Sequence, residues 1–188
     1  MEIINWENKN AIKVALKVID SGGIIVYPTD TIYGFGVNAK NPLAIDKLNI
    51  LKNRTGPISV IAPNREKVST WINVEQEEKL NAVNYIGAQN TIIYPVKKNV
   101  VHHKIMGPNN TLGIRIPNHP FCKLIANSFP APITTTSVNK TGESPKNNIK
   151  EILSSFPTGI DLIIEDGDLE NSASKIYIYT IDGLKNIR

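Results

Sequence analysis

The stretch Ile24-Ile25-Val26-Tyr27-Pro28-Thr29-Asp30-Thr31-Ile32-Tyr33-Gly34-Phe35-Gly36 decides the fold that we expect for this chain. Its first four residues are apolar and mostly β-branched, which predicts a buried strand, and Pro28 ends the strand because it has no N–H to donate. Hydroxyls, a carboxylate and two glycines follow, which is typical of a binding loop. We expect residues 29–31 to supply donors and acceptors, and Gly34 and Gly36 to let backbone approach a ligand. A strand followed by an ordinary turn would give the same local pattern.

Composition and charge indicate an ordinary soluble globular protein, with 41% hydrophobic and 20% charged residues. No apolar run approaches the roughly 20 residues needed to cross a bilayer, and the first residues lack the regions of a signal peptide. We therefore expect one cytoplasmic domain over residues 1–188, without a membrane partner. Cys122 is the only cysteine and is expected to be a packed core thiol. The net charge of +4 tolerates an anionic partner such as a nucleotide or RNA without demanding one.

Helical and strand-like patterns alternate along the chain. Apolar residues at helical spacing predict helices over residues 11–21, 42–51, 65–72, 75–84, 120–129 and 148–156. Apolar or alternating runs predict strands over residues 24–27, 58–62, 91–96, 111–117, 161–165 and 175–181, and another from residue 133. This order favours an α/β domain with an open twisted sheet and flanking helices.

Polar side chains that could bind a ligand gather in four places: Thr29 to Thr31, Lys52 with Arg54, Thr111 with Arg115, and Ser137 with Asn139. Lys52 and Arg54 lie at a helix end, where they either interact with the helix dipole or converge on one anion. In a strand, Arg115 would share a face with Thr111, an arrangement that suits a carboxylate or phosphate or is simply solvated. No Ser-His-Asp set, zinc spacing or glycine-rich phosphate motif occurs, so we expect an anion site without a metal held by the protein.

Four motifs in this order resemble those of the YrdC-like family, the catalytic domain of L-threonylcarbamoyladenylate synthase. They are residues 27–36, Lys52-Asn53-Arg54, residues 111–120, and residues 137–144 (Ser-Val-Asn-Lys-Thr-Gly-Glu-Ser). The resemblance covers nearly the whole chain and implies an open sheet around a positively charged concave groove. It also implies synthesis of threonylcarbamoyl-AMP and pyrophosphate from L-threonine, bicarbonate and ATP with Mg²⁺. The threonylcarbamoyl group then passes, through transfer proteins, to adenosine 37 of tRNA.

The resemblance further implies a role for each matching residue. Contacts with L-threonine are implied for Thr31, Arg115, Ser137 and Ser174. Contacts with ATP are implied for Lys52, Arg54, Thr111, Asn139 and Asn147. Lys52 and Arg54 would neutralise the phosphates, since attack on an α-phosphate needs alignment and charge neutralisation more than a protein nucleophile.

The sequence departs from the family pattern in several loops. Residues 55–57 are shorter than usual and lack a basic or amide residue, and Ile61 stands near a usual histidine. Residues 86–88 replace a usual Pro-Gly-Pro, Ser174-Lys175 replaces Ser-Thr, and the second domain of longer relatives is not seen. These departures leave two alternatives open: a non-catalytic paralogue that binds nucleotide or double-stranded RNA, and an unrelated α/β protein whose motifs match by accident.

Overall fold

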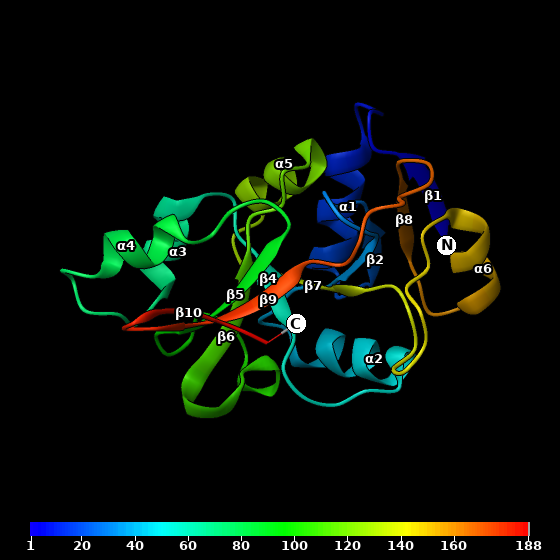
Figure 1. Ribbon diagram of the computed structural model, residues 1–188. Helices are drawn as coiled ribbons and strands as arrows, with labels where there is room; N and C mark the ends of the chain where they lie inside the picture. Colours follow the sequence, from blue (N-terminus) through cyan, green and yellow to red (C-terminus); the bar gives the residue numbers. More distant parts are fainter. Residues whose placement is uncertain (188) are drawn as a thin grey trace.

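The computed structural model describes residues 1–187, through which runs a ten-stranded mixed sheet (Figure 1). The spatial order is β1-β8-β2-β3-β7-β4-β6-β5-β9-β10. The strands are β1 (Glu2–Asn5), β2 (Ile25–Tyr27), β3 (Gly34–Gly36), β4 (Ser59–Ile61), β5 (Asn90–Pro95), β6 (Thr111–Arg115), β7 (Ile133–Ser137), β8 (Leu162–Glu165), β9 (Lys175–Thr180) and β10 (Gly183–Asn186). Strand β7 is antiparallel to both neighbours, whereas β4 and β6 are parallel, so the sheet is mixed. The predicted α/β domain with an open sheet is confirmed.

Helices connect most of these strands. They are α1 (Ala11–Asp20), α2 (Pro42–Lys52), α3 (Arg65–Trp71), α4 (Lys79–Asn84), α5 (Pro120–Ser128) and α6 (Ile149–Ser155), with 3₁₀ turns η1 (His103–Ile105) and η2 (Pro108–Asn110). Helix α2 begins as predicted: the Asn41 side chain accepts hydrogen bonds from the N–H groups of Leu43 and Ala44, and Pro42 occupies the first turn. It ends at Asn53, whose φ of 49° is left-handed.

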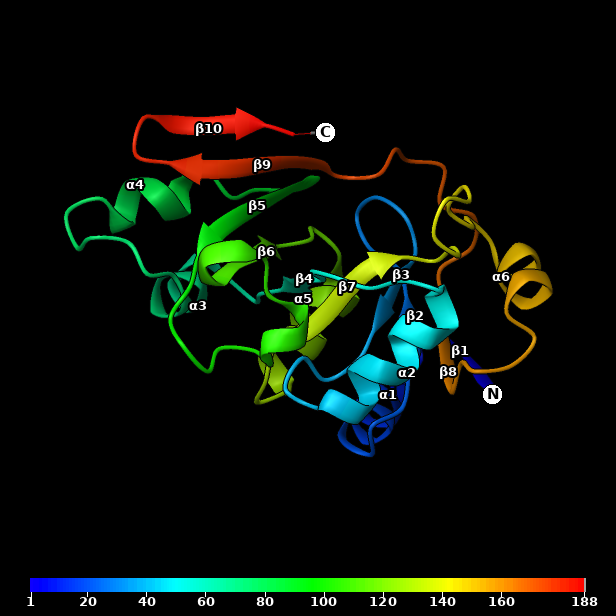
Figure 2. The same ribbon diagram turned by 90° about the horizontal axis from the view of Figure 1, so that it is seen from below.

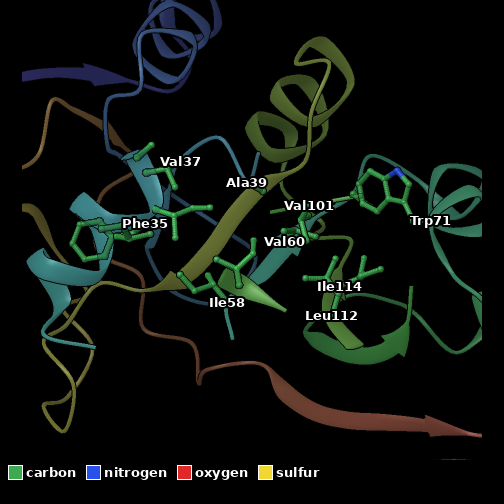
Figure 3. Packing of buried hydrophobic residues seen from close by; sticks show 14 of the residues in the cluster. Phe35, Val37, Ala39, Ile58, Val60, Trp71, Val101, Leu112 and Ile114 are labelled. Atoms are coloured by element: carbon green, nitrogen blue, oxygen red, sulfur yellow. The ribbon is translucent and has the colours of Figure 1, made fainter. Parts of the chain in front are cut away.

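The sheet separates two hydrophobic layers. Figure 1 shows α1 and α5 on one side of the central strands and α2 on the other. Under α1 and α5, Ile19 and Phe121 pack in one cluster with Ile25 and Tyr27 of β2. On the other side Phe35, Val60 and Ile114 form the larger core together with residues of α2 (Figure 3). Each fully buried side chain of this size contributes roughly 1.5–3 kcal/mol to stability, so these layers hold the central strands in place.

Several elements differ from the expectations above. Strands β1, β3 and β10 were not predicted, and the expected helix over 75–84 covers only Lys79–Asn84. β1 and the β9–β10 hairpin lie at opposite edges of the sheet (Figure 2). Cys122 is buried as predicted, and its thiol donates to the carbonyl of Pro28 at 3.2 Å. Across the described residues, none of the helices has the length and apolar character required to cross a bilayer.

The expectation for Gly36 was wrong. Gly36 is in β3 and pairs with Ile25 of β2, so it does not form part of a ligand-binding loop. A Cβ on Gly36 would lie 2.7 Å from a ring carbon of Tyr27 and 3.1 Å from a side-chain carbon of Ile25. Gly36 is therefore needed for close packing within the core, and the loop after β2 ends before Gly34.

Candidate functional site

A cavity of about 410 Å³ opens where β3, β4, β6 and β7 meet the loops that follow β2 and β7. Its walls bring together segments that are far apart in the sequence. The lining residues are Thr29, Ile32, Tyr33, Gly34, Arg54, Pro57, Ser59, Thr91, Arg115, Thr135, Thr136, Ser137, Asn139, Glu143, Pro145, Ala173, Ser174 and Ile176. The cavity thus contains two arginines, one carboxylate and many hydroxyls, which favours a polar, anionic ligand.

Small polar side chains line the cavity where it meets the strands. Ser59 of β4 pairs with Thr135 of β7, and Thr91 of β5 lies near them. Next to these residues, a Cβ on Gly113 of β6 would collide with the Ser59 hydroxyl and lie 3.3 Å from the Thr91 methyl group. Gly113 therefore lets these strands approach one another beside the cavity.

Arg115 is held at one wall of the cavity by a buried ion pair. Only 6% of Arg115 is exposed, and its Nη2 donates to Asp30 Oδ1 at 2.7 Å and to Thr31 Oγ1 at 3.0 Å. The Thr31 hydroxyl is also 3.0 Å from the Thr29 hydroxyl, which donates to the carbonyl of Ile32 at 2.7 Å. The loop after β2 therefore holds the guanidinium through a charge and a chain of hydroxyls.

Arg54 approaches the cavity from another wall and is held only by neutral acceptors. Its Nη1 donates to Thr136 Oγ1 at 3.2 Å and its Nη2 donates to the carbonyl of Pro57 at 2.5 Å. No carboxylate within residues 1–187 forms an ion pair with it. Burial lowers the pKa of Arg54 below its ordinary value, but a guanidinium keeps its charge in proteins. Its positive charge is therefore available to a ligand.

Lys52 is directed at backbone oxygens and is not among the residues that line the cavity, whereas Arg54 is; convergence of the two cations on one anion stays a prediction. Its Nζ donates to the carbonyl of Ser137, to the carbonyl of Asn139 at 2.7 Å and to Asn139 Oδ1 at 3.3 Å. It also lies 5.3 Å from the ring centroid of Phe35. Burial, together with the nearby charge of Arg54, lowers the pKa of Lys52 to about 7. Lys52 therefore supports the loop after β7 from behind the cavity wall.

The loop after β7 is ordered by its own side chains. Ser137 Oγ donates to Asn139 Oδ1 at 2.5 Å, and Asn139 Nδ2 donates to the carbonyls of Lys140 at 2.9 Å and Glu143 at 2.8 Å. Ser137, Asn139 and Glu143 all line the cavity. Two predicted site residues are thus placed at one wall by a single compact turn.

Of the remaining predicted site residues, one lines the cavity, one lies behind its wall and two are not among the lining residues. Ser174 lines the cavity, and its hydroxyl is 3.0 Å from that of Thr91. Thr31 is 1% exposed and lies behind Arg115. Thr111 and Asn147 are not among the lining residues: the Thr111 hydroxyl donates to the carbonyl of Pro108 at 2.8 Å, and the main-chain N–H of Asn147 donates to Glu151 Oε2.

Sequence reasoning did not select several residues that shape the cavity. Tyr33 donates to the carbonyl of Gly167 and accepts from the N–H of Asp166, both at 2.8 Å, so it fixes the loop after β8. Burial raises the pKa of Tyr33 to about 12, so the phenol stays protonated. The sequence predicts that Asp30 supplies a hydrogen-bond acceptor in the loop after β2, but it does not predict a role for Asp30 in the site. A signal was available for Ser59, Thr91 and Thr135, which are polar residues within predicted buried strands.

The described part of the chain contains no cluster of three or more His, Cys, Asp or Glu side chains suited to holding a metal ion. Glu143 is the carboxylate in the cavity lining, and it lies 3.5 Å from Lys146 Nζ.

Comparisons with known proteins show which family the chain resembles. A model of the Sua5/YciO/YrdC family, described as "Telomere recombination", matches residues 17–188. The chain is similar to a threonylcarbamoyl-AMP synthase of Hydrogenovibrio crunogenus, with 28% identity over 94% of this chain and 96% of the relative. It is also similar to a threonylcarbamoyl-AMP synthase of Vibrio campbellii, with 33% identity over 73% of this chain and 76% of the relative.

Solved structures share the fold. The chain resembles E. coli YciO with a TM-score of 0.86 and 23% identity, over 100% of this chain and 93% of that one. It resembles P. abyssi Sua5, solved in complex with L-threonine, with a TM-score of 0.87 and 23% identity over 100% of this chain. The chain spans 57% of that Sua5 chain. On the match to the family model, which covers all but the first 16 residues, the chain belongs to the Sua5/YciO/YrdC family.

Proposed function

We propose that the chain is a threonylcarbamoyl-AMP synthase, a nucleotidyltransferase that forms threonylcarbamoyl-AMP and pyrophosphate from L-threonine, bicarbonate and ATP. The observation that carries the proposal is the placement of Arg54 and Arg115 at two walls of one cavity. Arg115 is paired with a carboxylate and Arg54 is not. The relatives named threonylcarbamoyl-AMP synthase support the same activity.

The reaction needs two anionic groups to be held in line. The ammonium group of L-threonine first loses a proton. The free amine then adds to the carbon of bicarbonate with loss of water, which gives a carbamate. A carbamate oxygen then attacks the α-phosphorus of ATP, and the bond to the β-phosphate oxygen breaks to release pyrophosphate. No protein nucleophile is required, so the main demands are alignment and charge neutralisation.

The residues divide these tasks. Arg115 binds the carboxylate of L-threonine, with Thr31 behind it, and Ser174 and Ser137 lie at neighbouring walls. Arg54 and Asn139 face the triphosphate of ATP, and Lys52 holds their wall through the carbonyls of Ser137 and Asn139. Thr111 and Asn147 would need to contact a part of ATP that extends beyond the cavity. Because Asp30 is paired with Arg115, the proposed positive charge of the groove comes mainly from Arg54, with Lys52 behind its wall.

The cofactor and partners are part of the same proposal. Mg²⁺ bound to ATP would help to neutralise the phosphate charge, and Glu143 is the carboxylate of the cavity lining that could contact it. The product supplies the threonylcarbamoyl group for tRNA adenosine 37 through separate transfer proteins. We place the reaction in the cytoplasm, where ATP, L-threonine and tRNA meet.

Pyrophosphate release tests the proposal. The wild-type chain is incubated with ATP and Mg²⁺, with and without L-threonine and bicarbonate, and compared with R54A and R115A. Release that requires both co-substrates and fails in the two variants is the expected result. No release by a folded wild-type chain that still binds ATP would contradict the proposal.

One observation favours the second candidate, a non-catalytic paralogue that binds nucleotide or double-stranded RNA. Lys52 is directed at backbone carbonyls, so in this arrangement Arg54 is the basic side chain presented on the proposed ATP side of the cavity. Salt-sensitive binding to an RNA duplex without pyrophosphate release would identify this alternative.

A further inference from the structure

Asp30 is buried between Arg115 and a neighbouring loop, and both of its carboxylate oxygens accept a hydrogen bond. Its side chain is 7% exposed, and Oδ1 accepts from Arg115 Nη2 at 2.7 Å. Oδ2 accepts from the main-chain N–H of Gln89 at 2.9 Å. A carboxylate anchored at both oxygens does not rotate freely, so Asp30 offers Arg115 an acceptor in a fixed position.

Gln89 is itself fixed by the backbone around it. Its φ of 58° is left-handed, and its carbonyl accepts from the N–H of Lys175 at 3.1 Å. Because the bond to Asp30 comes from a main-chain N–H, it does not depend on which side chain stands at position 89. The series Gln89 N–H, Asp30 carboxylate and Arg115 guanidinium therefore runs from the residue before β5 to the wall of the cavity.

The nitrogens of Arg115 are used unequally. Nη2 is shared between Asp30 and Thr31, whereas Nε is buried and has no acceptor among residues 1–187. A guanidinium is planar, so fixing Nη2 from two directions also limits where the Nε–H can point. The Nε–H has lost water without gaining a protein partner, a situation that a ligand oxygen relieves.

We propose that Asp30 is a positioning residue that holds the Arg115 guanidinium so that its free N–H groups receive the carboxylate of the amino-acid substrate. The inference rests on the proposed function of the cavity. Asp30 also balances the charge of Arg115, so this wall recognises a carboxylate by directed hydrogen bonds. Arg54, which has no carboxylate partner in the described chain, is left to attract the phosphates.

The D30N variant of the full chain tests this role, because it keeps the size of the side chain and removes its charge. We expect the KM for L-threonine to rise about tenfold, the size of one weakened charge-assisted contact, while the KM for ATP changes less than about twofold. A merely structural role would raise both constants together. D46N is the matched control. Asp46 does not line the cavity, and it forms an exposed ion pair with Lys104, with 2.7 Å between the charged atoms.

A substrate without the carboxylate separates positioning from general damage. L-Threoninol retains the amine and side chain of L-threonine but has no group for Arg115 to bind. Calorimetry should show that the wild-type chain and D46N bind L-threonine much more tightly than L-threoninol. In D30N the ratio of the two dissociation constants should be about tenfold smaller.

A double-mutant cycle keeps the test decisive if D30N is poorly folded. In an R115Q background, where the guanidinium is absent, adding D30N should leave the affinity for L-threonine unchanged. Equal losses in both backgrounds, or an unchanged KM for L-threonine in D30N, would overturn the proposal.

Failure of the proposed function gives a different pattern. If the wild-type chain releases no pyrophosphate but binds L-threonine, and D30N weakens that binding, the role of Asp30 stands and the synthase assignment falls. If the wild-type chain does not bind L-threonine at all, both are wrong.

Discussion

The two arginines of the cavity are held in opposite ways. Arg115 comes from the end of β6, is 6% exposed, and is paired with the buried carboxylate of Asp30. Arg54 comes from the turn after α2 and is held by the Thr136 hydroxyl and the Pro57 carbonyl. A paired guanidinium binds through fixed N–H directions, whereas an unpaired one also presents net charge. The comparison teaches that one cavity can hold a charge-balanced and an unbalanced guanidinium side by side, which is what the proposed division between carboxylate recognition and phosphate neutralisation requires.

Removing Arg115 should have the largest effect. R115A leaves Asp30 buried without its partner, so we expect a loss of about 3–5 kcal/mol in the free energy of unfolding. We also expect pyrophosphate release to fall about a thousandfold, as for loss of a preorganised charged contact. R115K tests the fork geometry: it should recover part of the stability but little of the affinity for L-threonine. Chemical denaturation and steady-state kinetics measure both effects, and full activity in R115K would contradict this assignment.

Removing Arg54 should affect activity but not stability, which would sharpen the contrast. R54A is expected to lower kcat/KM for ATP about a hundredfold and to change the free energy of unfolding by less than about 1 kcal/mol, since no buried charge is left unpaired. The matched control is R65A, because Arg65 also donates to a backbone carbonyl, that of Ile86, but does not line the cavity. An R54A variant as unstable as R115A would contradict the conclusion that the two arginines are held in different ways.

Lys52 should give a pH dependence to the wall of the cavity that we propose faces ATP. With a pKa of about 7, Lys52 loses a proton as pH rises through neutrality and then has two N–H groups for three oxygen acceptors. The support of the Ser137 to Asn139 turn weakens, so we expect the affinity for ATP to fall above pH 7. In the K52M variant this fall in ATP affinity above pH 7 should be absent. An ATP affinity of the wild-type chain that does not change between pH 6 and 9 would contradict this role of Lys52.

Stability should move in the opposite direction. The ordinary pKa of a lysine is 10.5, and the folded chain lowers it to about 7. Between these values the unfolded chain binds the proton more than the folded chain does, so the free energy of unfolding rises with pH over this window. The measurement is denaturant unfolding at several pH values, compared between the wild-type chain and K52M, in which the lysine contribution to this slope is absent.

A change in the strands beside the cavity should have the smallest effect on activity. G113A places a methyl group against the Ser59 hydroxyl and near Thr91, so we expect a loss of about 1–3 kcal/mol from overpacking. Because Ser59 and Thr91 line the cavity, activity should fall by a smaller factor than in R54A. G87A is the control, since a Cβ there meets no atom within 4 Å. Unchanged stability in G113A would show that the strands can shift apart.

Much of the fold was predictable because local patterns and tertiary packing agree. Asn41-Pro42 fixed the start of α2, and the apolar run before Pro28 fixed β2. Strand β3 was missed because a Gly-Phe-Gly sequence has low strand propensity and forms a strand only between β2 and β7. The beginning of α4 was misplaced because an exposed, charged segment carries little apolar periodicity.

The candidate site was predicted as a set of residues more accurately than as an arrangement. The sequence by itself determined that Arg54, Arg115, Ser137 and Asn139 lie at or just after the ends of predicted elements and that Ser174 lies just before the last predicted strand. The structure places all five around one cavity. Only the tertiary structure decided that Lys52 turns toward backbone carbonyls and that Asp30 reaches Arg115, 85 positions later in the chain. Such contacts join distant segments through the register of neighbouring strands, and local propensity carries no information about that register.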